Sequence, residues 1–208
     1  MQEELQVHVV TPAMPFAELK GFLSECGDAD FVQLRFKKPD GSPSLSEAKM
    51  REAIEHAKRT LDCPIIVNDL PRFVGLVDGI HVGQGDTPWW RLKKELPNKI
   101  VGLSIGKPEH LDKLARELKE HGLLPDYLGV GSVFATKSKR DAHDGGVGLL
   151  KRTRSFLKER GLEIPVIAIG GVTPENAASI RDLCDGVAAI SVFKENPRAA
   201  IREFKERS

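Results

Sequence analysis

The sequence predicts an α/β fold, a single (β/α)8 TIM barrel in which eight parallel strands alternate with helices. Short, continuously apolar segments, typical of parallel strands covered on both faces, alternate with amphipathic segments along all 208 residues. Closure of the sheet would remove both exposed edges. We expect one domain, residues 1–208, because no composition break marks a linker and no repeat is detected. A doubly wound open sheet is the alternative.

The first four strand–helix units fill the N-terminal half. The polar loop Lys38–Pro43 is long enough to be a lid over a site. The third unit leaves room for only a short helix, so its placement is the least certain. Strands are expected at Leu5–Thr11, Phe31–Lys37, Pro64–Val67 and Ile80–Val82, and helices at Phe16–Cys26 and Leu45–Leu61.

The last four units follow the same alternation. Pro165 stands at the start of a strand, where its missing N–H does least harm, and Thr173 with Pro174 marks the start of a helix. Strands are expected at Ile100–Ser104, Tyr127–Val130, Val166–Ile169 and Val187–Ile190, and helices at Pro88–Leu96, Pro108–His121, Gly148–Arg160, from Pro174, and Pro197–Arg207.

Composition narrows the classes of function. The net charge is +1, with 31 basic and 30 acidic residues interspersed, so neither nucleic acid nor an anionic membrane is an expected partner. The 3 cysteines are widely spaced, which disfavours a disulfide framework or a zinc site and favours a cytoplasmic protein. The N-terminus lacks the pattern of a signal peptide, and no apolar run approaches membrane-spanning length.

A glycine pair follows the seventh expected strand. Gly170 and Gly171 leave backbone N–H groups able to approach an anion, and Ser191 follows the next apolar run. These features predict a phosphate cup. The alternative is a tight strand-to-helix turn, and the glycines alone do not decide between the two.

Polar side chains gather where other strands should end. Alternation places Gln33, Arg35 and Lys37 on one face of the second strand, which favours a function toward an anion over simple solvation at the rim. Asp69, beside Asn68, and Asp86 come at the ends of the third and fourth expected strands, and such oxygen ligands suit Mg²⁺.

Other interpretations stay open for three of these features. Asp86 could instead cap the helix that follows it. His81 is expected to face the barrel interior, where a structural role is as plausible as a functional one. After the sixth strand, the hydroxyls and ammonium groups of Gly131–Asp141 could bind phosphate oxygens, although a solvated loop would look similar.

Together these motifs resemble the thiamine-phosphate synthase family and the related thiazole tautomerases. The resemblance implies condensation of hydroxymethylpyrimidine diphosphate with a thiazole phosphate, giving thiamine phosphate and pyrophosphate. It is compatible with a homo-oligomer. The matching segments, in family order, are 33–37, 68–69, 81–86, 102–104, 127–131, 136–139, 168–172 and 187–191.

The resemblance also implies a role for each matching residue. Asp69 and Asp86 would hold Mg²⁺, while Gln33, His81 and Ser104 would orient the pyrimidine. The residues assigned to catalysis are Arg35, Lys37, Asn68 and Lys139, which would hold the diphosphate, together with Ser104. The thiazole phosphate would contact Thr136, Ser138, Gly170, Gly171, Ser191 and Val192.

The chain departs from the family pattern at a few positions. Ser132 stands where the family usually has Pro and the tautomerases have a catalytic His, and Ile105 stands where another polar residue is common. Both Asp69 and Asp86 are kept, which favours the synthase. The alternatives are a tautomerase, which would need His81 or His143 as its acid or base, and a relative that binds these phosphates without turnover.

Overall fold

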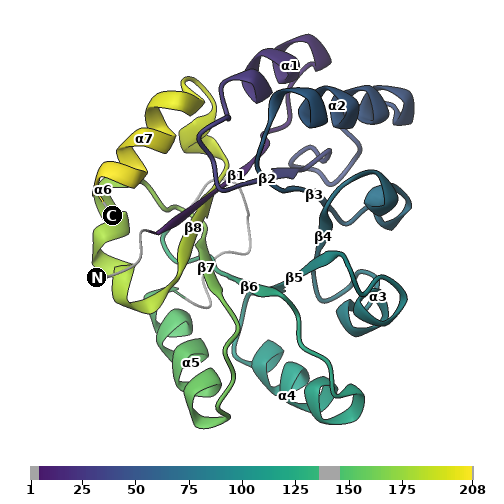
Figure 1. Cartoon of the computed structure of the whole chain (residues 1–208). Coiled ribbons are helices and arrows are strands. Elements are labelled where there is room, and N and C mark those ends of the chain that lie inside the picture. Colours follow the sequence, from purple (N-terminus) through teal and green to yellow (C-terminus); the bar gives the residue numbers. More distant parts are fainter. Residues whose placement is uncertain (1–4, 136–145, 208) are drawn as a thin grey trace.

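The computed structural model describes residues 5–135 and 146–207, and Figure 1 views the chain down the axis of a barrel. Eight parallel strands pair in sequence order, and β8 closes the sheet by pairing with β1. The predicted closed barrel is therefore confirmed, and the open sheet is wrong. The strands are β1 Gln6–Val10, β2 Phe31–Leu34, β3 Ile65–Asn68, β4 Gly79–Val82, β5 Ile100–Ile105, β6 Tyr127–Val130, β7 Val166–Ile169 and β8 Gly186–Ala189.

Helices surround the barrel and cover its outer face (Figure 1). Local signals set several of their ends: Ser46 caps α2 through Lys49 N, and Gly122 ends α4 in the left-handed conformation, φ 64°. The α-helices are α1 Phe16–Ser24, α2 Glu47–Thr60, α3 Trp89–Glu95, α4 Glu109–His121, α5 Gly146–Glu159, α6 Pro174–Ala177 and α7 Pro197–Arg207, and the 3₁₀ helices are η1 Pro71–Leu76, η2 Ala178–Leu183 and η3 Ser191–Phe193.

Two connections differ from expectation. The third unit has no α-helix, because its short segment forms only the 3₁₀ helix η1. The second strand ends at Leu34 rather than Lys37: Arg35 N donates to Thr11 Oγ1, and Lys37 pairs with Pro43 in an antiparallel bridge. The loop Lys38–Pro43 is thus closed at its base, and its role as a lid stays a prediction.

The core has two parts. A large one lies between strands and helices, and a smaller one fills the barrel interior with Val10, Ile66, Tyr127, Ile167 and Ala188. Glycines in the strands leave space for interior rings. A Cβ on Gly102 would lie 2.2 Å from Tyr127 Cζ, and one on Gly129 would lie 2.8 Å from His81 Cε1.

The amino-terminal end of the barrel carries a repeated contact, which we call the aspartate clasp. In the described part of the chain, an aspartate precedes each even-numbered strand. Its carboxylate accepts from a backbone N–H of the preceding strand, and its own N–H donates to the same residue's carbonyl. The clasps join Asp30 to Val7, Asp78 to Ile65, Asp126 to Val101 and Asp185 to Val166, with carboxylate distances of 2.6–2.8 Å and return distances of 2.8–3.0 Å.

Two sequence-based expectations about the chain's environment can be compared with the structure. Cys26, Cys63 and Cys184 are free thiols, as expected. Within residues 5–135 and 146–207, none of the helices combines the length and apolar character needed to cross a bilayer.

The clasps should contribute measurably to stability. We expect Asp78→Ala to lower the free energy of unfolding by about 1–3 kcal/mol, because the N–H of buried Ile65 loses its acceptor. Asp78→Asn keeps an acceptor oxygen and should cost less. Urea unfolding of the three proteins measures the difference, and equal stability of the alanine variant and the wild type would contradict the role of the clasp.

His8 should make stability depend on pH. Its ring is buried and stacked on Phe31, and burial lowers its pKa from 6.5 to about 3. Below about pH 6.5 the unfolded chain therefore takes up a proton that the folded chain does not, so stability falls by about 1.4 kcal/mol per pH unit on acidification. In His8→Asn this part of the slope should be absent.

The measurement is the free energy of urea unfolding between about pH 7 and about pH 5, above the range in which most carboxylates titrate. The same substitution at His56, on the outer surface, is the matched control. A wild-type slope that persists unchanged in His8→Asn would show that another group is responsible.

Candidate active site

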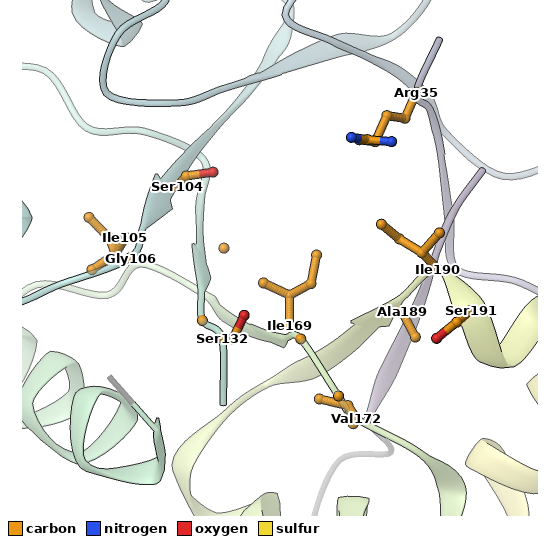
Figure 2. A pocket seen from close by; sticks show the side chains of 14 residues that line it. Arg35, Ser104, Ile105, Gly106, Ser132, Ile169, Val172, Ala189, Ile190 and Ser191 are labelled. Atoms are coloured by element: carbon orange, nitrogen blue, oxygen red, sulfur yellow. The ribbon is translucent and has the colours of Figure 1, made fainter. Parts of the chain in front are cut away.

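A pocket opens at the carboxyl end of the strands, as expected for this barrel. It has about 700 Å³ of space, counting the part open to solvent. Figure 2 shows the Arg35 guanidinium and the Ser104 hydroxyl pointing into it from opposite sides. The lining comes from β2, β5, β6, β7 and β8 and their loops: Arg35, Ser104, Ile105, Gly106, Gly129, Gly131, Ser132, Ile169, Gly170, Gly171, Val172, Ala189, Ile190 and Ser191.

The glycine pair after β7 forms one wall of this pocket. Gly170 and Gly171 have φ values of 95° and 66°, a conformation that other residues rarely adopt. A Cβ on Gly171 would also lie 2.5 Å from Ala135 O. Asn176 stabilises the turn, since its Nδ2 donates to Gly171 O and its Oδ1 accepts from Thr173 N, both at 2.9 Å. The pair is a tight turn, and it also presents bare backbone to the pocket.

The segment after β8 supplies the neighbouring wall. The strand ends at Ala189, so Ser191 does not end the strand but begins the 3₁₀ helix η3. Ser191 still lines the same pocket as Gly171, as expected. Val192 does not line the pocket; its side chain packs against the core between barrel and helices.

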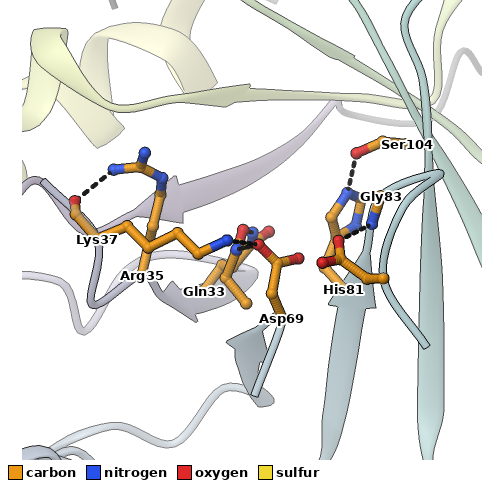
Figure 3. A network of polar contacts seen from close by, with 9 residues as sticks. Gln33, Arg35, Lys37, Asp69, His81, Gly83 and Ser104 are labelled. Carbon is orange, nitrogen blue, oxygen red and sulfur yellow. Dashed lines mark hydrogen bonds and ion pairs between the residues drawn. The ribbon is translucent and has the colours of Figure 1, made fainter. Parts of the chain in front are cut away.

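A chain of polar contacts joins the ends of β2 and β3 (Figure 3). Gln33 Nε2 donates to Asn68 Oδ1 at 2.7 Å. Asn68 Nδ2 in turn donates to Asp69 Oδ2, which also receives the Lys37 ammonium at 2.6 Å. These four predicted residues therefore meet, although Lys37 reaches the group from beyond the end of its strand.

Arg35 connects this group to the pocket. Its Nη1 donates to Lys37 O at 2.8 Å, and its side chain lines the pocket. Burial lowers the pKa of Arg35, an effect that the carboxylate of Asp69 opposes. A guanidinium remains protonated even so, and its planar array of donors suits phosphate oxygens.

Asp69 and Asp86 lie next to each other across β3 and β4. Asp69 has φ 56°, unusual for a residue other than glycine and a form of local strain that often marks functional sites. Asp86 Oδ2 accepts from Gly83 N at 2.8 Å, while α3 begins after Pro88, so Asp86 does not cap that helix. Partial loss of hydration and a hydrogen-bonding contact with Asp69 raise the pKa of Asp86.

The donor set at this point suits a hard cation that keeps water ligands. Within residues 5–135 and 146–207, no group of three or more His, Cys, Asp and Glu side chains is arranged to hold a metal ion. Asp69 and Asp86, which are in contact, could supply two carboxylates and leave the remaining positions to waters or phosphate oxygens, as is typical of Mg²⁺.

His81 lies inside the barrel below the mouth. Its Nδ1 is 2.8 Å from the Tyr127 hydroxyl, and its Nε2 is 2.8 Å from Ser104 Oγ. The ring is thus held at both nitrogens, and Ser104 carries this network to the pocket wall. The expectation that His81 faces the interior is confirmed.

Three predicted residues, Thr136, Ser138 and Lys139, lie outside the described residues, as does His143. Sequence reasoning assigned no role to Tyr127 or Asn176, which position the site. Asn176 had a recognisable signal, because it lies at the third helical position after the cap Thr173. Tyr127 had none beyond being a hydroxyl in an apolar strand.

Comparison with known proteins gives consistent matches. Residues 7–193 match the family model described as thiamine monophosphate synthase. The thiamine-phosphate synthase of Geobacillus thermodenitrificans is 33% identical over 95% of this chain and 88% of its own, and that of Moorella thermoacetica is 37% identical over 86% and 82%. A solved structure, the thiamine phosphate pyrophosphorylase of Pyrococcus furiosus, has a TM-score of 0.73 and 29% identity, covering 98% of this chain and 95% of that one.

Proposed function

The chain belongs to the thiamine monophosphate synthase family, and on this premise we propose that it is a Mg²⁺-dependent thiamine-phosphate synthase. It transfers the aminopyrimidinylmethyl group from hydroxymethylpyrimidine diphosphate to a thiazole phosphate, releasing pyrophosphate. The observation that carries the proposal is the convergence of two anion-binding features, Arg35 and the Gly170–Gly171 wall, on one pocket beside a pair of carboxylates.

The diphosphate lies on the side of the pocket formed by β2 to β4. Arg35 and Lys37 bind its oxygens, with Asn68 and Lys139 as further donors. Lys37 is half-exposed and paired with Asp69 before substrate arrives. Its exposed ammonium would be able to contact a phosphate oxygen if a divalent cation replaced it beside Asp69.

Asp69 and Asp86 would hold the Mg²⁺, which would supply positive charge next to the leaving diphosphate. The hydrogen bonds from Asn68 and from Gly83 N orient the two side chains toward this task.

The two organic groups occupy the rest of the pocket. Gln33, His81 and Ser104 orient the pyrimidine, and the Gly170–Gly171 backbone with Ser191 binds the thiazole phosphate. Thr136, Ser138 and Val192 contribute on that side, Val192 through its backbone because its side chain packs into the core. The face between Arg35 and Gly171 is where the two reactants meet.

The reaction depends more on neutralising the charge of the leaving diphosphate than on proton transfer. The methylene–oxygen bond breaks, the diphosphate leaves with the electron pair, and the aminopyrimidine stabilises the resulting cation. The thiazole nitrogen then donates its lone pair to form the new carbon–nitrogen bond. Stabilisation of the leaving group therefore contributes most to lowering the barrier, which accounts for so many cationic groups.

A thiazole tautomerase is the second candidate, and the site favours it less. Such an enzyme needs a general acid or base at the mouth. Ser132 stands where the tautomerases have histidine, and His81 already contacts Tyr127 and Ser104. A relative that binds without turnover would share the pocket, and only an assay separates it from a synthase.

The proposal extends to the setting of the protein. We place it in the cytoplasm, acting as one domain over residues 1–208 and compatible with a homo-oligomer, with no nucleic acid or membrane partner. Free cysteines and the balanced charge support this setting.

Activity should depend on Arg35 and Asp69. We expect Arg35→Ala and Asp69→Ala to reduce pyrophosphate release by about two orders of magnitude or more, because Arg35 would contact the leaving diphosphate directly and Asp69 would hold the cation that neutralises it. The assay uses both substrates with Mg²⁺. Arg91→Ala, which removes a guanidinium from the exposed surface, is the control and should keep full activity. Wild-type rates in either site variant would contradict the assigned roles.

Binding of a divalent cation alone should depend on pH. Because the pKa of Asp86 is raised, a proton competes with the cation at a higher pH than it would at an ordinary aspartate. The affinity for the cation should therefore begin to fall at a correspondingly higher pH on acidification. Mn²⁺, which takes similar oxygen ligands, can be followed by its electron paramagnetic resonance between about pH 7 and about pH 5. Asp86→Asn should weaken binding at every pH. Unchanged affinity in this variant would place the cation elsewhere.

A further inference from the structure

Tyr127 occupies the centre of the barrel and has no role in the function proposed above. Its ring lies over Gly102 with Val10, Ile66 and Ile167 around it, and only 5% of the residue is exposed. Tyr127→Phe would leave this apolar packing intact. The hydroxyl therefore needs an explanation other than filling space.

The hydroxyl has a defined partner. Among the hydrogen bonds of the described residues, it contacts His81 Nδ1 at 2.8 Å, while the ring lies among apolar side chains with His8 edge-on to it. A buried O–H left without an acceptor is costly, so Tyr127 donates to Nδ1. Burial also raises the pKa of Tyr127 well above its usual value, which keeps this proton in place.

The direction of this bond determines the next one. With Nδ1 acting as an acceptor, neutral His81 carries its hydrogen on Nε2. Nε2 then donates to Ser104 Oγ, 2.8 Å away. Because Nε2 already carries a hydrogen, it cannot accept one from Ser104. The hydroxyl hydrogen of Ser104 must therefore be donated to a different acceptor.

Ser104 is placed to offer that hydrogen to a ligand. Its hydroxyl points into the pocket opposite Arg35 (Figure 2). Its backbone is held as well, because Gln84 Nε2 donates to Ser104 O at 2.8 Å. An ordered donor that needs no rearrangement on binding is more effective than a freely rotating hydroxyl.

We propose that Tyr127 is a positioning residue that sets the Nε2–H tautomer of His81 and thereby directs the Ser104 hydroxyl hydrogen to an acceptor atom of the pyrimidine diphosphate. The part concerning the ligand rests on the proposed function. The part concerning the tautomer involves only Tyr127, His81 and Ser104, so it can be tested without turnover.

The tautomer can be read from ¹⁵N NMR of the histidine side chains, with His81 assigned by His81→Asn. The expected result is a hydrogen on Nε2 in the wild type and a shift of the Nδ1 resonance in Tyr127→Phe. Thr153→Val removes another buried hydroxyl, one that bonds within α5, and should leave the His81 signals unchanged. A hydrogen on Nδ1 in the wild type would overturn the proposal.

Kinetics test the effect on the ligand. Tyr127→Phe should lower kcat about tenfold and leave KM for the thiazole phosphate unchanged. Because Tyr127 acts through Ser104, the double variant with Ser104→Ala should be no slower than Ser104→Ala alone. Additive losses, or an unchanged kcat in Tyr127→Phe, would overturn the positioning role. A wild type that releases no pyrophosphate but shows the Nε2–H tautomer would refute the proposed function alone.

Discussion

The closed ring of parallel strands depends on how its amino-terminal end is held. Each aspartate clasp ties the start of an even-numbered strand to the start of its neighbour through two reciprocal hydrogen bonds. Register is set at this end, where a one-residue slip would turn interior side chains outward. The carboxyl ends of the strands are then free to carry residues chosen for chemistry rather than for closure.

The charged side chains at the mouth of the barrel are also held in place by a chain of contacts. Lys37 and Asn68 both contact Asp69, and Gln33 connects this group to the barrel interior. Such a group is oriented before any ligand arrives, because each member contacts the next. The strained backbone of Asp69 persists only because these contacts support it.

Much of this could be predicted from the sequence. Strand positions follow from apolar runs, and Gly170, Gly171 and Ser191 were placed at one pocket because parallel strands end on the same side. What could not be predicted depends on contacts between distant segments. The early end of β2 follows from the bridge between Lys37 and Pro43 and the hydrogen bond to Thr11, neither of which has a local signal. The clasps could not be predicted, because a single aspartate before a strand is too short a pattern to be recognised as a repeat.

The two interior histidines show why residue type alone does not decide function. His8 lies in the middle of β1, stacked on Phe31 with a polar contact to Gln6 at 3.3 Å, and burial lowers its pKa to about 3. His81 lies nearer the mouth and bonds to hydroxyls at both nitrogens. Tyr127 contacts both rings, edge-on to His8 and tilted against His81. His8 is thus held mainly by ring packing, whereas His81 belongs to a directed hydrogen-bond chain. The contact of His81 Nε2 with Ser104, a pocket residue, makes His81 part of the site.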